Sequence, residues 1–157
     1  FTIDPPLTVD RDALKRRLFD AYALSGGYEY RHCIAQDHPF VIGFTVYDSF
    51  LSARTARWGI QPMPDLQREW VNGGHAVCVI GYDMDFRGSE WALDAVREGY
   101  PKSKVPESVY VIRNSWGTEW GHGGDVAIDS RYIDDLRFAD DAWTGRNFKP
   151  AKSGLVD

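Results

Sequence analysis

The feature that most restricts the fold of this chain is a strand that ends in a polar, glycine-rich loop, within residues 109–128 (VYVIRNSWGTEWGHGGDVAI). Its first residues are β-branched and aromatic, which predicts a buried strand over 109–115. A second strand is predicted over 125–129, after the glycines. One asparagine stands at the end of the first strand, and two tryptophans lie between the strands. They place polar and aromatic side chains where a buried strand opens to solvent.

The rest of the chain combines two further strands with several helices. Runs of β-branched and aromatic residues predict strands over 40–47 and 75–83. Helices are expected over 11–24, after an aspartate N-cap, and over 28–38, where a proline ends the helix. A strand-rich middle flanked by helices indicates the α+β class, with an antiparallel sheet at its centre.

The connections between these elements define the expected domain organisation. Residues 48–70 are expected to be irregular, and residues 130–143 to form helical turns. Residues 84–108 make an excursion between two strands and contain one predicted helix over 89–100. We therefore expect an N-terminal helical segment 1–38, a β-rich lobe 39–147 with 84–108 as its insertion, and a frayed tail 148–157.

Composition limits the classes of function. The chain has 157 residues, enough for one domain or one lobe of a larger one, and 43% of them are hydrophobic, which supports a buried core. Its formal net charge of -5 argues against nucleic acid as a partner. No apolar run approaches the length of a membrane span. The 2 cysteines are too few for a disulfide framework.

Strand alternation sorts the polar residues by face. His75 shares a face of its strand with Val77, whereas Cys78 points the other way. Asn114 shares a face with Ile112. Both polar residues stand at strand ends, where a rigid scaffold fixes a side chain that water can still reach. The glycines directly before His75 allow a tight turn and the close approach of a bound chain.

An asparagine near a histidine has a chemical use. A histidine that serves as a base, or as the cation of an ion pair, must be held in one tautomer and orientation. The amide oxygen of Asn114 can accept a hydrogen bond from one ring nitrogen of His75 and so hold it. Trp116, two residues further on, is placed to shield the pair from water, and Trp120 to lie on the adjoining surface.

The segments GGHAVCVIGYD and YVIRNSWGTEWGHGG, in this order, resemble the two C-terminal signatures of papain-like cysteine peptidases. The resemblance covers roughly residues 30–145, and FADDAW near the end is similar to bacterial members. It implies an antiparallel sheet or half-barrel with flanking helices. It also implies that His75 is the catalytic histidine, that Asn114 orients it and that Trp116 shields it. By the same resemblance Gly73 and Gly74 bind substrate, Gly74 through its carbonyl, and Ser115, Gly117 and Trp120 shape the motif.

The family's nucleophile lies in a Cys-Gly-Ser/Ala-Cys-Trp/Tyr signature, with the histidine about 130–150 residues downstream. Only 74 residues precede His75, and none of them carries that signature. The glutamine that helps to form the family's oxyanion hole has no assignable match either. The chain therefore resembles the right-hand lobe of the fold, which bears the histidine and the asparagine. The expected partners are a peptide or protein substrate and an N-terminal lobe or fragment that carries the cysteine.

The two cysteines of the chain are weak candidates for the nucleophile. Cys33 precedes His75 and Asn114, as in the family's order, but it has neither a glycine nor an aromatic neighbour. It is expected to be a small apolar residue of a helix and is kept only as the weaker alternative. Cys78 points away from His75 and is expected in the core. No histidine spacing indicates a metal site, and the chemistry requires no cofactor.

Three functions are consistent with these motifs. The favoured one is a cysteine endopeptidase whose nucleophile lies outside this chain, so that the chain alone is expected to be inactive. The alternatives are a non-catalytic binding or regulatory module, and a Cys-His acyltransferase or deamidase. The family resemblance implies secretion or a vesicular or lysosomal location.

Overall fold

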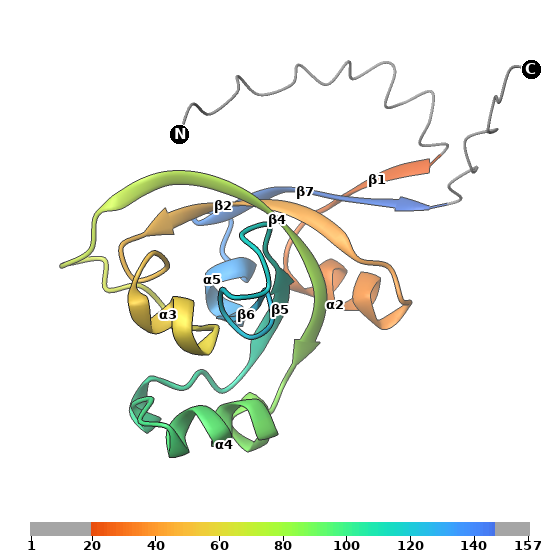
Figure 1. Cartoon of the computed structure of the whole chain (residues 1–157). Coiled ribbons are helices and arrows are strands. Elements are labelled where there is room, and N and C mark those ends of the chain that lie inside the picture. Colours follow the sequence, from red (N-terminus) through yellow and green to blue (C-terminus); the bar gives the residue numbers. More distant parts are fainter. Residues whose placement is uncertain (1–19, 147–157) are drawn as a thin grey trace, which may run out of the picture.

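The computed structural model describes residues 20–146, which form one sheet with helices around it (Figure 1). The strands are β1 (Asp20–Leu24), β2 (Phe40–Tyr47), β3 (Ile60–Gln61), β4 (Val71–Asp83), β5 (Val109–Arg113), β6 (Asp125–Asp129) and β7 (Ala139–Arg146). The helices are α2 (Gly27–Ala35), α3 (Ala53–Trp58), α4 (Glu90–Arg97) and α5 (Ser130–Asp134), with short 3-10 turns η1 (Phe86–Gly88) and η2 (Lys102–Lys104).

The seven strands lie in the order β1-β7-β2-β4-β5-β6-β3. Neighbouring strands are antiparallel, except that β3 runs parallel to β6. The predicted α+β class, with an antiparallel sheet at its centre, is confirmed. The sheet is curved, and β4 follows a long arc from the strands around β2 and β7 to the region of α4 (Figure 1).

The alternation of β2 shows why these residues form a strand. Phe40, Ile42 and Phe44 are buried on its inner face, whereas the residues between them are exposed or half-buried. The inner face packs against α2 and α5 and forms the larger core cluster. A smaller cluster, around Phe86 and Tyr100, lies beneath the excursion between β4 and β5. The larger cluster includes Val77 and Val79 of β4, and both clusters include residues of β5, so the core anchors the two strands that carry the site.

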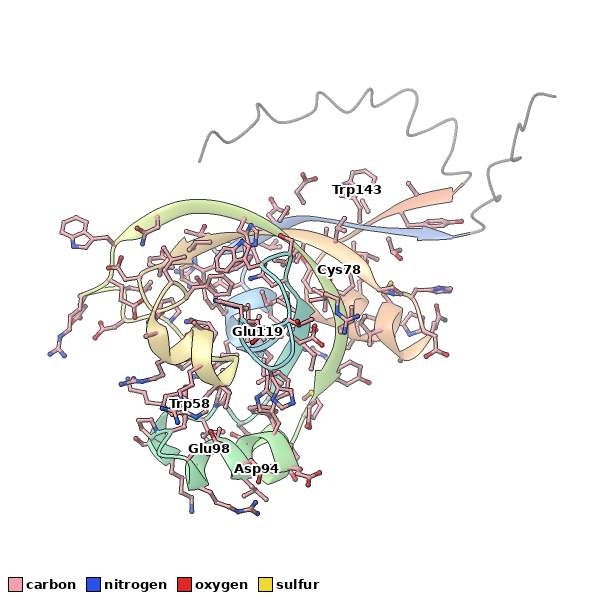
Figure 2. The ribbon with its side chains drawn as sticks, in the orientation of Figure 1. Trp58, Cys78, Asp94, Glu98, Glu119 and Trp143 are labelled. Atoms are coloured by element: carbon pink, nitrogen blue, oxygen red, sulfur yellow. The ribbon has the colours of Figure 1, made fainter. Side chains whose placement is uncertain are left out.

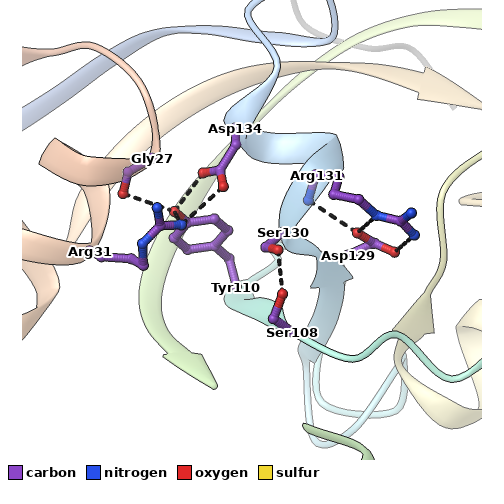
Figure 3. Close-up of polar contacts among 8 residues, drawn as sticks. All are labelled: Gly27, Arg31, Ser108, Tyr110, Asp129, Ser130, Arg131 and Asp134. Atoms are coloured by element: carbon purple, nitrogen blue, oxygen red, sulfur yellow. Dashed lines mark hydrogen bonds and ion pairs between the residues drawn. The ribbon is translucent and has the colours of Figure 1, made fainter. Parts of the chain in front are cut away.

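A partly buried polar network joins α2, β5 and α5 (Figure 3). The Tyr110 hydroxyl donates to Asp134 Oδ1 at 2.7 Å, and Arg31 Nη1 donates to the Tyr110 oxygen at 3.0 Å and to Asp134 Oδ2 at 2.9 Å. Burial, with the hydrogen bond to Asp134, raises the pKa of Tyr110, so its hydroxyl stays protonated and donating. Helix α2 approaches closely at Gly27, where a side-chain carbon would overlap the Asp134 carboxylate.

Two predicted helical regions are in part strands. The helix expected over 11–24 is wrong for 20–24, which form β1 and pair with β7, and residues 11–19 lie outside the described part. The expected helical turns over 130–143 are confirmed at α5, but residues 139–146 form β7, between β1 and β2. Pairing, on both sides for β7 and with β7 for the edge strand β1, outweighs the weak local preference of these residues. Asp141, at a φ of 57°, adopts a left-handed conformation that aspartate tolerates better than most residues.

The segment 48–70 was predicted to be irregular but contains α3 and β3. Its helix signals are local: the Ser52 side chain accepts a hydrogen bond from the Thr55 N–H, and Gly59 ends the helix in a left-handed conformation. The remaining predicted elements are found, with β4 beginning at Val71 instead of residue 75. The domain limits stay predictions, and the tail 148–157 lies outside the described residues. Among the described residues, no helix has the length and apolar character that a membrane crossing requires.

Candidate active site

His75 and Asn114 come together where the neighbouring strands β4 and β5 meet the glycine-rich loop. His75 Nε2 lies 2.8 Å from Asn114 Oδ1. The Ser115 backbone N–H also donates to Oδ1, at 2.8 Å. Since a backbone N–H can only donate, this side-chain atom must be the amide oxygen, and the ring nitrogen that faces it must carry a proton. The contact therefore selects the tautomer that leaves His75 Nδ1 free for chemistry.

The aromatic roof predicted from the sequence lies over this pair. The ring of Trp116 stacks on His75 at a centroid distance of 5.2 Å and an interplanar angle of 26°. Trp120 packs edge-on against Trp116 at 5.0 Å. The predicted proximity of His75, Asn114 and Trp116 is confirmed, whereas their catalytic roles stay a prediction. Asn114 is only 8% exposed, but Trp116 is 43% exposed, so the roof still presents a face to solvent.

Phe50 supports the roof from below and was missed in the sequence. Its ring is fully buried and lies 5.6 Å from Trp116, 5.4 Å from Trp120 and 6.4 Å from His75. The available signal was a phenylalanine three residues after the predicted strand 40–47. The strand face alone did not show that this ring turns back beneath the site.

The glycines around the pair take the conformations that their positions require. Gly73 has a φ of 107° and nothing within 4 Å of the place where a side chain would begin. Gly74 is exposed on the strand directly before His75, and Gly117, with a φ of 92°, is exposed in the loop after Ser115. The backbone directly before the histidine is thus free of side chains that would hinder an approaching peptide.

Two carboxylates, which the sequence did not single out, hold the segment that leads into β4. Asp48 accepts hydrogen bonds from the Trp70 N–H and from Asn72 Nδ2, both at 2.8 Å. The Trp70 N–H first, and Asn72 second, lower the pKa of the Asp48 carboxyl. Glu69 accepts from the backbone N–H groups of Ser49 and Asp65. These bonds fix the chain just before the glycines that precede His75.

A cavity of about 630 Å³ opens beside His75. Its lining comes from three parts of the sheet: β2, the start of β4, and the segment that ends in β7. His75, Gly73 and Gly74 form part of the wall, and Trp116 does not line it. The cavity thus reaches the histidine by a face other than the one that Trp116 covers.

Neither cysteine of the chain faces His75 in a way that suits a nucleophile. Cys33 is buried in the core on α2, as predicted, and its thiol lies 3.2 Å from the His38 carbonyl oxygen. Cys78 was expected in the core but is only partly buried, because it is on the outer face of β4, across from Arg113 on β5. Burial raises the pKa of the Cys78 thiol, which opposes thiolate formation. Within residues 20–146, no group of three or more histidine, cysteine, aspartate or glutamate side chains is arranged to hold a metal ion.

Comparison with known proteins assigns the family. The model of the papain family cysteine proteases matches residues 20–143, most of the chain. The chain belongs to the papain family of cysteine proteases. The family predicted from the histidine and asparagine signatures is thus confirmed, and the papain-like fold with it.

Relatives from several sources share this region. An uncharacterised peptidase C1-like protein of Acanthamoeba polyphaga mimivirus is 27% identical over 113 residues, which are 72% of this chain and 29% of the viral protein. Xylellain, a cysteine protease from Xylella fastidiosa, is 27% identical with a TM-score of 0.63 over 83% of this chain and 40% of its own. The clostridial cysteine protease Cwp84 is 17% identical, with a TM-score of 0.54 over 82% and 28% of the two chains, and shows the shared fold. The chain therefore spans less than half the length of these relatives.

Proposed function

We propose that this chain provides the histidine and asparagine of a cysteine endopeptidase and cleaves peptide bonds when an N-terminal lobe or fragment presents a cysteine thiol to His75. The observation that carries the proposal is the Nε2 to Oδ1 contact of 2.8 Å, with the Ser115 N–H fixing which atom of Asn114 accepts. It leaves Nδ1 of a rigidly held imidazole as the proton acceptor that a nucleophilic thiol requires.

The proposed reaction begins with transfer of the thiol proton to His75 Nδ1. The resulting thiolate attacks the peptide carbonyl carbon, and the Nδ1 proton moves to the leaving amine as the carbon–nitrogen bond breaks. Water then attacks the thioester, gives a proton to Nδ1 and releases the acid and the thiol. The Nε2–H donates to Asn114 throughout, so the ring keeps one orientation as its charge changes.

The surroundings of His75 support this chemistry. Trp116 and Phe50 exclude water from one side of the ring, which strengthens the thiolate–imidazolium attraction. The exposed backbone at Gly73 and Gly74 allows an extended peptide to lie against β4. In this arrangement the Gly74 carbonyl accepts a hydrogen bond from the substrate N–H next to the scissile bond.

The first test uses the 157-residue chain alone with a fluorogenic peptide library. We expect no hydrolysis, because Cys33 is buried in the core and the thiol of Cys78 is on the opposite strand face from His75. Turnover that survives Cys33→Ala and Cys78→Ala but disappears in His75→Ala would require a different nucleophile within this chain. It would contradict the proposal that the nucleophile lies on a separate N-terminal lobe.

The second test joins the chain to a cysteine-bearing N-terminal lobe, such as the part of xylellain that it does not match. We expect hydrolysis that iodoacetamide abolishes and that His75→Ala lowers at least a thousandfold. Trp120→Phe, which keeps an aromatic ring on the adjoining surface, is the matched control and should retain most of the activity. A stable joined protein that binds peptides without cleaving them would favour a binding module. Amide or acyl-transfer products in place of free acids would favour a deamidase or an acyltransferase.

A further inference from the structure

The cavity beside His75 has a charge and a shape that together point to a class of substrate. We infer that it accepts a long side chain with a cationic end, arginine or lysine, from the peptide bound at His75. The inference rests on the proposed function, which brings a peptide to this place, and it adds the chemical class of the side chain that the cavity selects.

Glycine residues keep the cavity free of side chains. Gly43 on β2 lines it, and a side-chain carbon built there would meet only the Asp140 carbonyl oxygen, at 3.5 Å. The φ of Gly43 is not in the left-handed region, so its backbone does not require glycine. Any larger residue at this position would extend into the cavity. Gly73 and Gly74 open the adjoining wall in the same way.

Apolar side chains form much of the remaining lining. Val71 and Ala76 contribute from β4, and Leu136 and Phe138 from the segment before β7. Arginine and lysine bury an apolar stem along such surfaces while their charged ends stay near polar groups. The lining therefore suits the stem of either residue and leaves the choice of residue to the charged groups of the cavity.

Those charged groups are not balanced. Asp140 and Asp141 line the cavity, and neither forms an ion pair with any described residue. Asp141 Oδ1 accepts a hydrogen bond from Trp143 Nε1 at 2.7 Å, a neutral donor that leaves the carboxylate charge uncompensated. Asp140 has a side chain with no hydrogen-bond partner in the described part of the chain.

Arg137 brings a guanidinium to the lining, and this cation is already paired, whereas the charge that His75 gains in the proposed reaction is balanced by the thiolate. The Arg137 guanidinium donates to both carboxylate oxygens of Asp135, at 2.6 to 3.1 Å. Hydrogen bonds from the Arg137 side chain, then from its backbone N–H, lower the pKa of Asp135 to about 2, so the pair remains intact at neutral pH. The cavity therefore keeps the negative charge of Asp140 and Asp141, and a cationic side chain would supply the missing counter-charge.

The direct test compares two neutral-backbone probes, N-acetyl-arginine amide and N-acetyl-citrulline amide, which have nearly the same shape but differ in charge. Amide NMR shifts of Gly73, Gly74 and Ala76 report their binding to the 157-residue chain. We expect the arginine probe to bind at least about fivefold more tightly, the effect of one screened charge contact. Equal affinities, or no shifts with the arginine probe up to its solubility limit, would overturn the inference.

Three variants assign the effect to the cavity. The double change Asp140→Asn and Asp141→Asn keeps the side-chain shapes, and asparagine tolerates the left-handed φ of residue 141, so it should abolish the preference for arginine. Gly43→Leu should weaken both probes by filling the cavity. The control, Glu90→Gln with Asp94→Asn, removes the same number of charges from α4, on which Figure 2 labels Asp94, and should change nothing. A preference for arginine that survives the double Asn variant would contradict the assignment.

These outcomes separate this inference from the proposed function. Probe binding does not depend on hydrolysis. A chain that binds the arginine probe selectively, but supports no cleavage when joined to a cysteine-bearing lobe, would contradict the peptidase proposal and leave the charge selection intact. Conversely, an active joined protein that cleaves arginine- and citrulline-containing peptides with equal kcat/KM would end the charge selection alone.

Discussion

At Asn114, one oxygen accepts two hydrogen bonds, while the amide nitrogen is buried without a partner in the described part of the chain. An unpaired buried amide N–H₂ destabilises a fold by about 1–3 kcal/mol. This is the pattern expected of a residue kept for its geometry at a functional site and not for stability.

Asn114→Ala should therefore disturb the orientation of His75 while leaving the stability of the fold nearly unchanged. The lost hydrogen bonds are offset by removal of the unpaired amide, so the free energy of unfolding should change by less than about 1 kcal/mol. The His75 ring loses the acceptor that selects its tautomer, and ¹⁵N NMR should show the proton distributed over both ring nitrogens. An unchanged Nε2–H signal in the variant would mean that other groups fix the ring.

Tyr110, in contrast to Asn114, is expected to contribute to stability and not to the site. Its hydroxyl lies between Arg31 and Asp134 in the partly buried network of Figure 3. Tyr110→Phe should lower the free energy of unfolding by about 1–2 kcal/mol, because the Asp134 carboxylate loses a donor and Arg31 loses an acceptor. Urea denaturation measures the change. Tyr28→Phe is the control, since that ring is 80% exposed, and a loss as large in the control would contradict the explanation.

At the scale of elements, the parts of the fold that could be predicted are the runs of β-branched and aromatic residues. The runs 40–47 and 109–113 are rich in such residues and were found as strands, with regular alternation of burial in the first. The errors fell on polar segments whose structure depends on partners: 20–24 and 139–146 became strands because each pairs with a neighbour distant in sequence. The same segments explain what was missed in the site. Phe50, Asp48 and the acidic wall of the cavity all lie in or beside stretches predicted to be irregular or helical.

The hydrogen bonds of Asp48 to Trp70 and Asn72, which connect the end of β2 to the start of β4, lead to a prediction at the scale of elements. The folded-state pKa of Asp48 is lowered by the Trp70 N–H and Asn72, so the stability that it contributes is present above the unfolded value of about 4 and is lost as pH falls through the folded value. Asn72→Ala removes one donor and should raise the pKa of Asp48 toward its ordinary value, as measured by ¹³C NMR of the carboxyl.

Asp48→Ala should further speed hydrogen exchange of the Trp70 amide at neutral pH, because that N–H loses its acceptor. Asp83→Ala, at the far end of β4, is the control and should leave Trp70 protected. Equal protection of Trp70 in the wild type and in Asp48→Ala would show that the segment is held by Glu69 alone.

For the whole molecule, the outer face of the sheet carries an apolar row that the described residues leave uncovered. Val41 on β2 pairs directly with Cys78 on β4 and with Trp143 on β7, so the three side chains share one face. Val41 is 51% exposed and Trp143 is 45% exposed. Figure 2 labels Cys78 and Trp143 on the side of the molecule away from α4. A cysteine-bearing lobe, as we propose, would cover such a row.

Alone, the chain should therefore behave as a protein with an open apolar face. Contiguous apolar surface favours association, so we expect sedimentation coefficients that rise with concentration and binding of an anilinonaphthalene dye. Val41→Lys places a charge in the middle of the row and should reduce both effects. Leu93→Lys, on α4, changes an equally exposed apolar residue elsewhere and should reduce neither. If the wild-type chain is monomeric and binds no dye at any concentration, the row needs no partner, and a module that acts without a second lobe becomes the better explanation of the fold.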